Sequence, residues 1–102
     1  MKTLKKVEVT FQFTNGEEAL PPFEEMKEGV IYVSIEYRVS IHKCLCGCGQ
    51  KTVLIINENG DNDGWDLINH GNDKYSFTPS IGNFQIPCKS HYIITKNIAN
   101  FV

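Results

Sequence analysis

The fold is decided by a short cysteine-rich stretch, Cys44-Leu45-Cys46-Gly47-Cys48-Gly49, and by a second box later in the chain, Cys88-Lys89-Ser90-His91. Together the two boxes contain all four cysteines of the protein. Cysteines that lie so close together bridge poorly to one another and are better placed to share one metal ion. We therefore predict that the two boxes meet in the folded protein and form a single metal site.

The ligand types in these boxes favour a structural zinc ion, which takes four thiolate or imidazole ligands in a tetrahedron. The candidates are Cys44, Cys46, Cys48, Cys88 and His91. Spacing leaves two arrangements open. Either Cys88 and His91 join two of the three clustered cysteines, or all four cysteines bind the ion and His91 stays outside its coordination shell. A disulfide pair and an iron–sulfur cluster are less favoured, the latter because neither common ferredoxin spacing is present.

The size of the chain makes such a metal important. A chain of 102 residues is expected to form one domain, residues 1–102, with a modest core that buries roughly 60 to 70% of the unfolded surface. A metal would add stability that a small core cannot supply. The content of 41% hydrophobic and 11% aromatic residues is typical of a globular protein rather than a disordered one.

Charge and hydropathy indicate the cellular compartment of the protein and the class of its binding partner. No apolar run approaches the roughly 18 residues that a membrane span needs. Residues 1–7 contain lysines, but no apolar segment of a secretory signal follows them, so we expect a cytoplasmic protein. The net charge is −2 and the basic residues are scattered, which disfavours binding to nucleic acid and favours a protein partner. The sequence leaves the oligomeric state open.

Alternating side chains predict a mostly β fold of about seven or eight short strands, with a small α+β fold as the alternative. Residues 6–14 place valine and phenylalanine on one face and polar residues on the other. A long run from Val30 to Ile41 is expected to face the core with its odd-numbered residues and to break near residues 36–38. Further strands are expected at residues 52–56, 65–69, 75–78, 84–88, 91–95 and 98–101. Because Pro21-Pro22 excludes a regular helix, only residues 23–26 are expected to form one helical turn.

The remaining segments are expected to be turns or an exposed loop. Turns are predicted at residues 70–73 and 79–83, and residues 57–64 should form an exposed loop. His42 is expected to end a strand and bond to the backbone, whereas His70 is expected to face solvent from its turn. Trp65, Phe84 and Tyr92 are expected to be core aromatics.

Four boxes in one order give a resemblance to a known family. They are residues 28–34, His42 to Gly49, Pro79 to Asn83, and Pro87 to Ile94. In this order they resemble a bacterial family catalogued as domain of unknown function 6527, over roughly Leu20 to Val102. The resemblance implies a zinc-ribbon-like fold and a metal role for the five candidate ligands. It also implies an association with ubiquitin-like, E1-like and E2-like genes in bacterial conjugation operons.

These observations favour a non-enzymatic function. A closed shell of thiolates leaves no position for a catalytic water, and the chain has no H-E-x-x-H run. We therefore expect a zinc-stabilised protein-interaction module, which the resemblance implies is accessory to a bacterial ubiquitin-like conjugation or defence system. Two alternatives stay open: a metal- or cysteine-dependent enzyme, and a zinc ribbon that binds nucleic acid.

Overall fold

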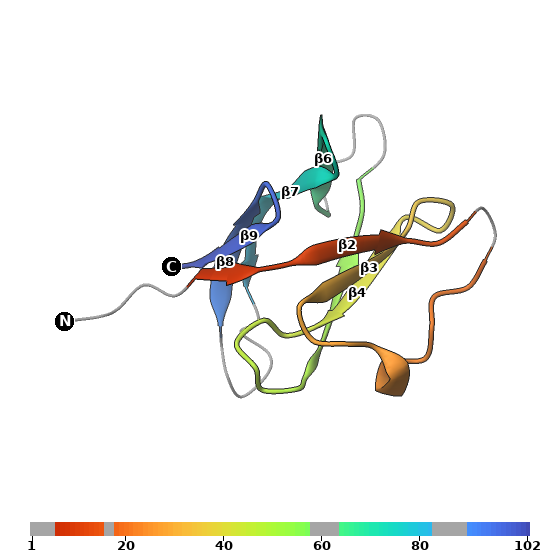
Figure 1. Cartoon of the computed structure of the whole chain (residues 1–102), viewed down its shortest axis with the longest axis horizontal. Coiled ribbons are helices and arrows are strands. Elements are labelled where there is room, and N and C mark those ends of the chain that lie inside the picture. Colours follow the sequence, from red (N-terminus) through yellow and green to blue (C-terminus); the bar gives the residue numbers. More distant parts are fainter. Residues whose placement is uncertain (1–5, 16–17, 58–63, 83–89) are drawn as a thin grey trace.

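The computed structural model describes residues 6–15, 18–57, 64–82 and 90–102, which form two β-sheets. The strands are β1 (Lys6–Glu8), β2 (Thr10–Phe13), β3 (Val30–Ser34), β4 (Val39–Lys43), β5 (Lys51–Ile55), β6 (Asp66–Gly71), β7 (Lys74–Gly82), β8 (His91–Thr95) and β9 (Ile98–Phe101). One sheet has the order β1-β9-β8-β7-β6 and the other β2-β3-β4-β5 (Figure 1). The predicted mostly β fold is thus confirmed.

The first two strands belong to one extended segment that takes part in both sheets (Figure 1). β1 pairs with β9 in the five-stranded sheet, and β2 pairs in parallel with β3 in the four-stranded sheet. The change of sheet occurs at Val9, whose N–H donates to the carbonyl of Asn97 at 2.9 Å, while the next N–H, of Thr10, donates to Gly29 at 2.8 Å. The predicted alternation of this segment is confirmed, since its apolar residues are buried or half-buried between exposed polar ones.

One core contains side chains of both sheets. Ile31 and Leu54 from the four-stranded sheet, and Phe77 and Ile94 from the five-stranded sheet, are all at most 1% exposed. The ring centre of Phe11, in the segment shared by both sheets, lies 5.7 Å from that of Phe77. Phe11 therefore helps to join the core side chains of the two sheets. Burial of this apolar surface is the main term that stabilises the fold.

The long apolar run is divided as predicted, but its second half faces the opposite way. Residues 35–38 form a turn between β3 and β4, and Val33 pairs with Ser40 across it. Paired residues share a face, so the core side changes from odd-numbered to even-numbered positions. Ser40 and His42 are therefore buried, whereas Ile35 and Tyr37 are 56% and 58% exposed. The prediction that these two residues face the core was wrong.

β7 is longer than the sequence indicated. It runs without a break to Gly82, so the predicted turn is wrong for residues 79–82. Its register with β8 shifts between Phe77 and Ile81, where residues 78–80 face the single residue Ile93. His70 is the penultimate residue of β6, and the turn consists of Asn72 and Asp73, both with positive φ. The strand predicted at residues 84–88, with Phe84 and Cys88, lies outside the described residues.

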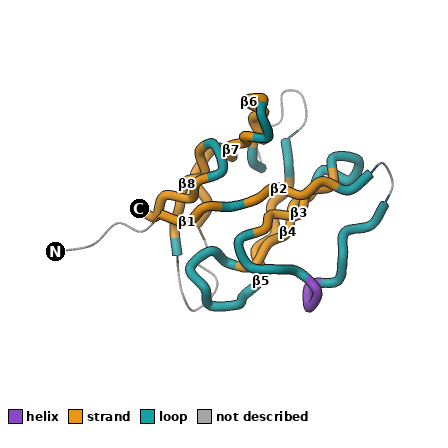
Figure 2. The backbone as a smooth tube through the Cα atoms, viewed as in Figure 1, coloured by secondary structure: helices purple, strands orange, loops and turns teal. Residues whose placement is uncertain are grey.

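One short 3₁₀ helix, η1 (Phe23–Glu25), confirms the predicted helical turn (Figure 2). Its start follows Pro22, and Met26 after it is buried. The backbone N–H of Lys27 donates to the hydroxyl of Tyr32 at 3.0 Å, which ties this segment to β3. Within the described part of the chain, no helix is long and apolar enough to cross a membrane.

Candidate functional site

The first three cysteines lie on a tight turn between β4 and β5. Cys44 directly follows β4, and its N–H donates to the carbonyl of Gln50 at 2.7 Å. The turn closes with a second bond, from the N–H of Gly47 to the carbonyl of Cys44 at 3.1 Å. Gly47 and Gly49 have φ angles of 92° and 81°, which favour glycine. The glycines thus let the backbone fold back and bring the three thiols to one side.

The sulfur positions suit a metal ion. The Sγ atoms of Cys44, Cys46 and Cys48 all lie within 4.8 Å of one another. The Cys44 and Cys46 sulfurs are 3.4 Å apart, too far for the roughly 2.05 Å bond of a disulfide. Thiolates on a tetrahedral zinc ion, each about 2.3 Å from it, would be separated by about 3.8 Å. The three cysteines, buried, half-buried and exposed in that order, could therefore hold a metal ion.

The second box reaches this turn. Cys88 lies outside the described residues, but Ser90, two positions later, is described and buried. Its Oγ lies 3.0 Å from the Sγ of Cys44, at hydrogen-bonding distance for a thiol or thiolate. The predicted meeting of the two boxes is supported by this contact between residues 46 positions apart. Sequence reasoning missed the role of Ser90, although it is part of the quoted box.

His91 points to a different neighbour. Its Nε2 lies 2.6 Å from the Oγ of Ser80, and it is not part of the group of possible metal ligands among the described residues. His91 pairs with Gly82, which has no side chain to fill the space opposite. Diagonal cross-strand neighbours lie within reach of long side chains, and Ser80 is such a neighbour in the irregular part of β7. Irregularities of this kind re-aim side chains and are frequent beside active sites.

Each of the three histidines of the chain places its Nε2 within hydrogen-bond distance of a hydroxyl group. His42 lies 2.8 Å from the hydroxyl of Tyr92, and both side chains are fully buried. Burial lowers the pKa of His42 from 6.5 to about 4. The predicted backbone partner of His42 is thus replaced by a side chain.

The second pair joins His70 Nε2 and Ser76 Oγ at 2.7 Å. His70 is exposed, as predicted, but Ser76 is buried, and its Oγ already accepts the N–H of Lys96 at 2.8 Å. Ser76 therefore serves to hold the turn after β8. In contrast, Ser80 and His91 are both half-buried, so this pair can meet another molecule.

A tryptophan fixes the backbone beside Ser80. The indole Nε1 of Trp65 donates to the carbonyl of Ser80 at 3.3 Å. Trp65 itself is bound to the end of β5, because its N–H donates to Ile55 and its carbonyl accepts from Asn57, at 2.9 and 2.8 Å. The half-buried indole packs against the core, in agreement with the prediction. It also connects the four-stranded sheet to the serine of the other sheet.

Comparison with known proteins bears on this serine–histidine pair. A family model described as BubE, bacterial ubiquitination-like system serine protease, matches residues 17–102. The chain belongs to the BubE family. This name differs from that of the family which the motifs resemble, but the matched family is likewise bacterial, and its description names a ubiquitination-like system. No curated protein and no solved structure matches the chain.

Sequence reasoning did not connect Ser80 with His91. Ser80 and His91 lie in two of the boxes that carried the resemblance, but the first box was interpreted as a turn and the second as a metal-ligand box. A serine in one box and a histidine in another was the available signal. Spacing alone could not show that the two side chains meet.

Proposed function

We propose that this protein is a serine protease of a bacterial ubiquitination-like system, with Ser80 as nucleophile and His91 as general base. The observation that carries the proposal is the 2.6 Å distance between Ser80 Oγ and His91 Nε2 in a half-buried position. A serine hydroxyl is a weak nucleophile until an adjacent base accepts its proton. A histidine nitrogen at this distance can accept that proton.

The chemistry follows from this contact. Ser80 Oγ attacks the carbonyl carbon of the scissile amide while His91 Nε2 takes the hydroxyl proton. His91 then gives the proton to the leaving amine, and an acyl ester remains on Ser80. Water, deprotonated by the same imidazole, hydrolyses the ester and returns both residues to their initial state. Trp65 keeps the backbone of Ser80 in place through its bond to the Ser80 carbonyl.

This proposal modifies the function expected from the sequence. A non-enzymatic module was expected, but the family name and the serine–histidine pair support an enzyme. The expected protein partner is kept, because a protease of such a system acts on a protein. We propose that its substrate is a ubiquitin-like protein, either as a precursor or as a conjugate.

The metal belongs to the scaffold in this proposal. We propose that Cys44, Cys46, Cys48 and Cys88 bind one zinc ion and that His91 stays outside its coordination shell. The Cys44–Ser90 contact supports the position of the second box, and the Ser80 contact of His91 supports the four-cysteine arrangement. Structural zinc sites couple about 10 kcal/mol or more of binding to folding. In this role the ion supplies stability, and no catalytic step passes through it.

The test is labelling with a fluorophosphonate probe, which reacts with activated serines. We expect one adduct per chain, located on Ser80 by peptide mass spectrometry, and no adduct in Ser80→Ala. Undiminished labelling of a folded Ser80→Ala protein would overturn the assignment.

The His70–Ser76 pair, whose serine is buried, provides a matched control for the half-buried His91–Ser80 pair. His91→Ala should lose labelling but keep one zinc per chain, whereas His70→Ala should keep both. Zinc content is measured by mass spectrometry of the native protein. Loss of zinc from His91→Ala together with unchanged labelling would make His91 a ligand rather than a base.

A further inference from the structure

The face of the four-stranded sheet that points away from the core carries an unusual combination of side chains. On β4 and β5 this outer face consists of three cross-strand pairs: Val39 with Ile55, Ile41 with Val53, and Lys43 with Lys51. Val53 and Ile55 are 45% and 57% exposed. The outer face is thus an apolar surface with two lysines at one end. Ile35 and Tyr37 in the β3–β4 turn add exposed apolar groups near the other end.

The segment around η1 covers only part of this side of the sheet. Tyr32, the β3 neighbour of Ile41, is buried and accepts a hydrogen bond from Lys27. Phe23 lies under the ammonium groups of Lys43 and Lys51, with its ring centre 5.8 and 6.0 Å from the two nitrogens. The exposed residues of β5 lie beyond this cover. Large exposed apolar surfaces next to polar rims mark sites of protein interaction.

The positive charges of Lys43 and Lys51 repel each other, so their pairing lowers the stability of the sheet. The hydrogen bonds from Cys44 to Gln50 and from Ile56 to Arg38 fix the ladder, so that Lys43 and Lys51 form one of its narrow, non-hydrogen-bonded pairs. Like charges directly opposite each other destabilise a sheet. The shared aromatic ring of Phe23 offsets part of this repulsion. A paired positive charge is thus maintained on a protein whose net charge is −2.

We propose that the outer face is the docking surface for the ubiquitin-like protein of this system, at a place separate from the serine–histidine pair. The proposal rests on the proposed function for the identity of the partner. The chemistry of the face defines the contact: an apolar centre meets Val53 and Ile55, and carboxylates of the partner meet Lys43 and Lys51. Ser80 and His91 belong to the other sheet, so the partner is bound at one sheet and cleaved at the other.

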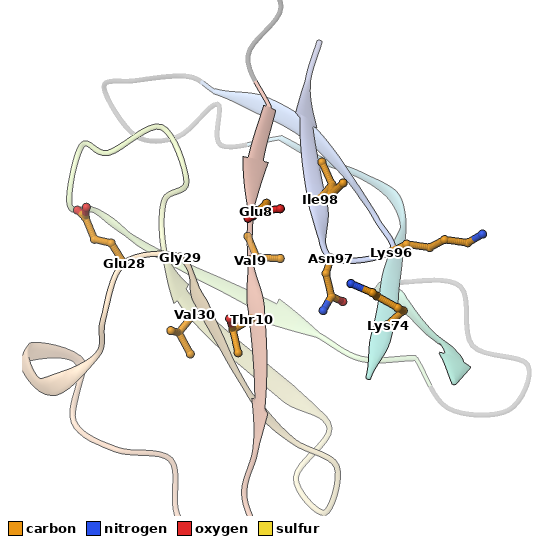
Figure 3. A pocket seen from close by; sticks show the side chains of 10 residues that line it. All are labelled: Glu8, Val9, Thr10, Glu28, Gly29, Val30, Lys74, Lys96, Asn97 and Ile98. Atoms are coloured by element: carbon orange, nitrogen blue, oxygen red, sulfur yellow. The ribbon is translucent and has the colours of Figure 1, made fainter. Parts of the chain in front are cut away.

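A second group of lysines allows a matched control. Lys74 and Lys96 line a groove of about 530 Å³ near the β8–β9 turn, whose lining also includes Glu8 and Glu28 (Figure 3). In the close-up, Glu28 lies on the side opposite the two lysines. Because the groove combines both signs of charge with a single exposed aliphatic residue, Ile98, it does not define one partner chemistry. Reversal of these two lysine charges changes the net charge as much as reversal on the outer face.

The experiment is a titration of the ¹⁵N-labelled, zinc-loaded Ser80→Ala chain with the ubiquitin-like protein of the system. The Ser80→Ala background prevents cleavage during the measurement. We expect amide shifts concentrated in residues 39–43 and 51–55. The double variant Lys43→Glu, Lys51→Glu should weaken binding about tenfold, and more at low salt, because rim charges steer and orient association. Lys74→Glu, Lys96→Glu should bind as tightly as the parent.

Fluorophosphonate labelling separates this proposal from the proposed function. In the Ser80 background, Lys43→Glu, Lys51→Glu should be labelled at the parental rate, because the probe needs only Ser80 and His91. Weakened binding with unchanged labelling supports a docking face that is separate from the serine–histidine pair. Shifts confined to other strands, equal weakening by the control pair, or no binding would overturn the proposal. If the chain forms a dimer, and the Lys43→Glu, Lys51→Glu variant is a monomer, the outer face binds a second copy of the chain and the proposal is overturned.

Discussion

Replacement of Tyr92 by phenylalanine removes one hydroxyl from the core and leaves the shape of the ring unchanged. That hydroxyl lies 2.8 Å from His42 Nε2, and both side chains are inaccessible to solvent. His42 Nδ1 already has no hydrogen-bond partner in the described part of the chain. In the described part of the chain, the substitution therefore leaves both nitrogens of the buried His42 imidazole without a hydrogen-bond partner. The ring of residue 92 still packs against Phe101, 4.9 Å away, so little packing is lost.

The magnitude follows from the cost of an unpaired buried polar group. Such a group costs about 1–3 kcal/mol, so we expect Tyr92→Phe to lower the free energy of unfolding by about 2 kcal/mol. This is a large part of the roughly 5–15 kcal/mol that stabilises a domain. For a domain of this size, each kcal/mol corresponds to about 4–8 °C in Tm. The variant should thus melt roughly 10 °C below the parent.

The assay is urea unfolding at pH 7 with saturating zinc, so that metal binding contributes equally to every variant. Tyr32→Phe is the control, because the Lys27 N–H that loses its acceptor lies on an exposed residue and can bind water. The double variant His42→Leu, Tyr92→Phe should recover most of the loss, since it removes both polar partners. A loss below about 0.5 kcal/mol for Tyr92→Phe, or no recovery in the double variant, would refute the described pair.

Three further predictions concern the turn glycines and the cysteine turn. Gly64→Ala should strongly lower the melting temperature, because the added Cβ would lie 2.2 Å from the Ile55 carbonyl oxygen. The control Gly71→Ala should cost only about 1 kcal/mol, because its only strain is a positive φ. Equal losses in the two variants would contradict the Gly64 contact. Cys44→Ser should reduce zinc content below one ion per chain and broaden amide spectra, and a stable, zinc-replete variant would exclude Cys44 as a ligand. Ser90→Ala should release zinc faster to a chelator than the parent does, because a thiolate loses a hydrogen-bond donor; unchanged release would show that the contact does not support the ion.

The strands were largely predictable because they depend on local alternation. Residues 6–14 show the two-residue period of a half-buried strand, and the structure places β1 and β2 there. The face of β4 was not predictable in the same way, since it depends on the number of residues in the preceding turn. Pairing of Val33 with Ser40 buried Ser40 and His42 and turned Val39 and Ile41 to the opposite face. Strand parity after a turn is a property of the hairpin and not of either strand alone.

The candidate site was predictable only in part. Three cysteines on one glycine-containing turn are close in sequence, so their proximity required little long-range information. The contact of Ser80 with His91 depends on the register of two strands and on an irregularity within β7. The imidazole of His91 could serve as a zinc ligand or as a base, and its position 2.6 Å from Ser80 Oγ supports the base in the proposed function. The ligand role of Cys88 stays a prediction, and the proposed function assigns His91 to the base rather than to the ligands.

The segment at residues 6–13 has a mechanical consequence for the whole domain. It is an edge strand of one sheet up to Glu8 and of the other from Thr10 onward, with Val9 as the joint. Peeling β2 away from β3 therefore strains the bonds of β1 to β9, and the reverse also holds. Amide hydrogen exchange should show both layers opening in one concerted event. The thiol turn and the serine–histidine pair, which lie in different layers, would then lose their structure at the same moment.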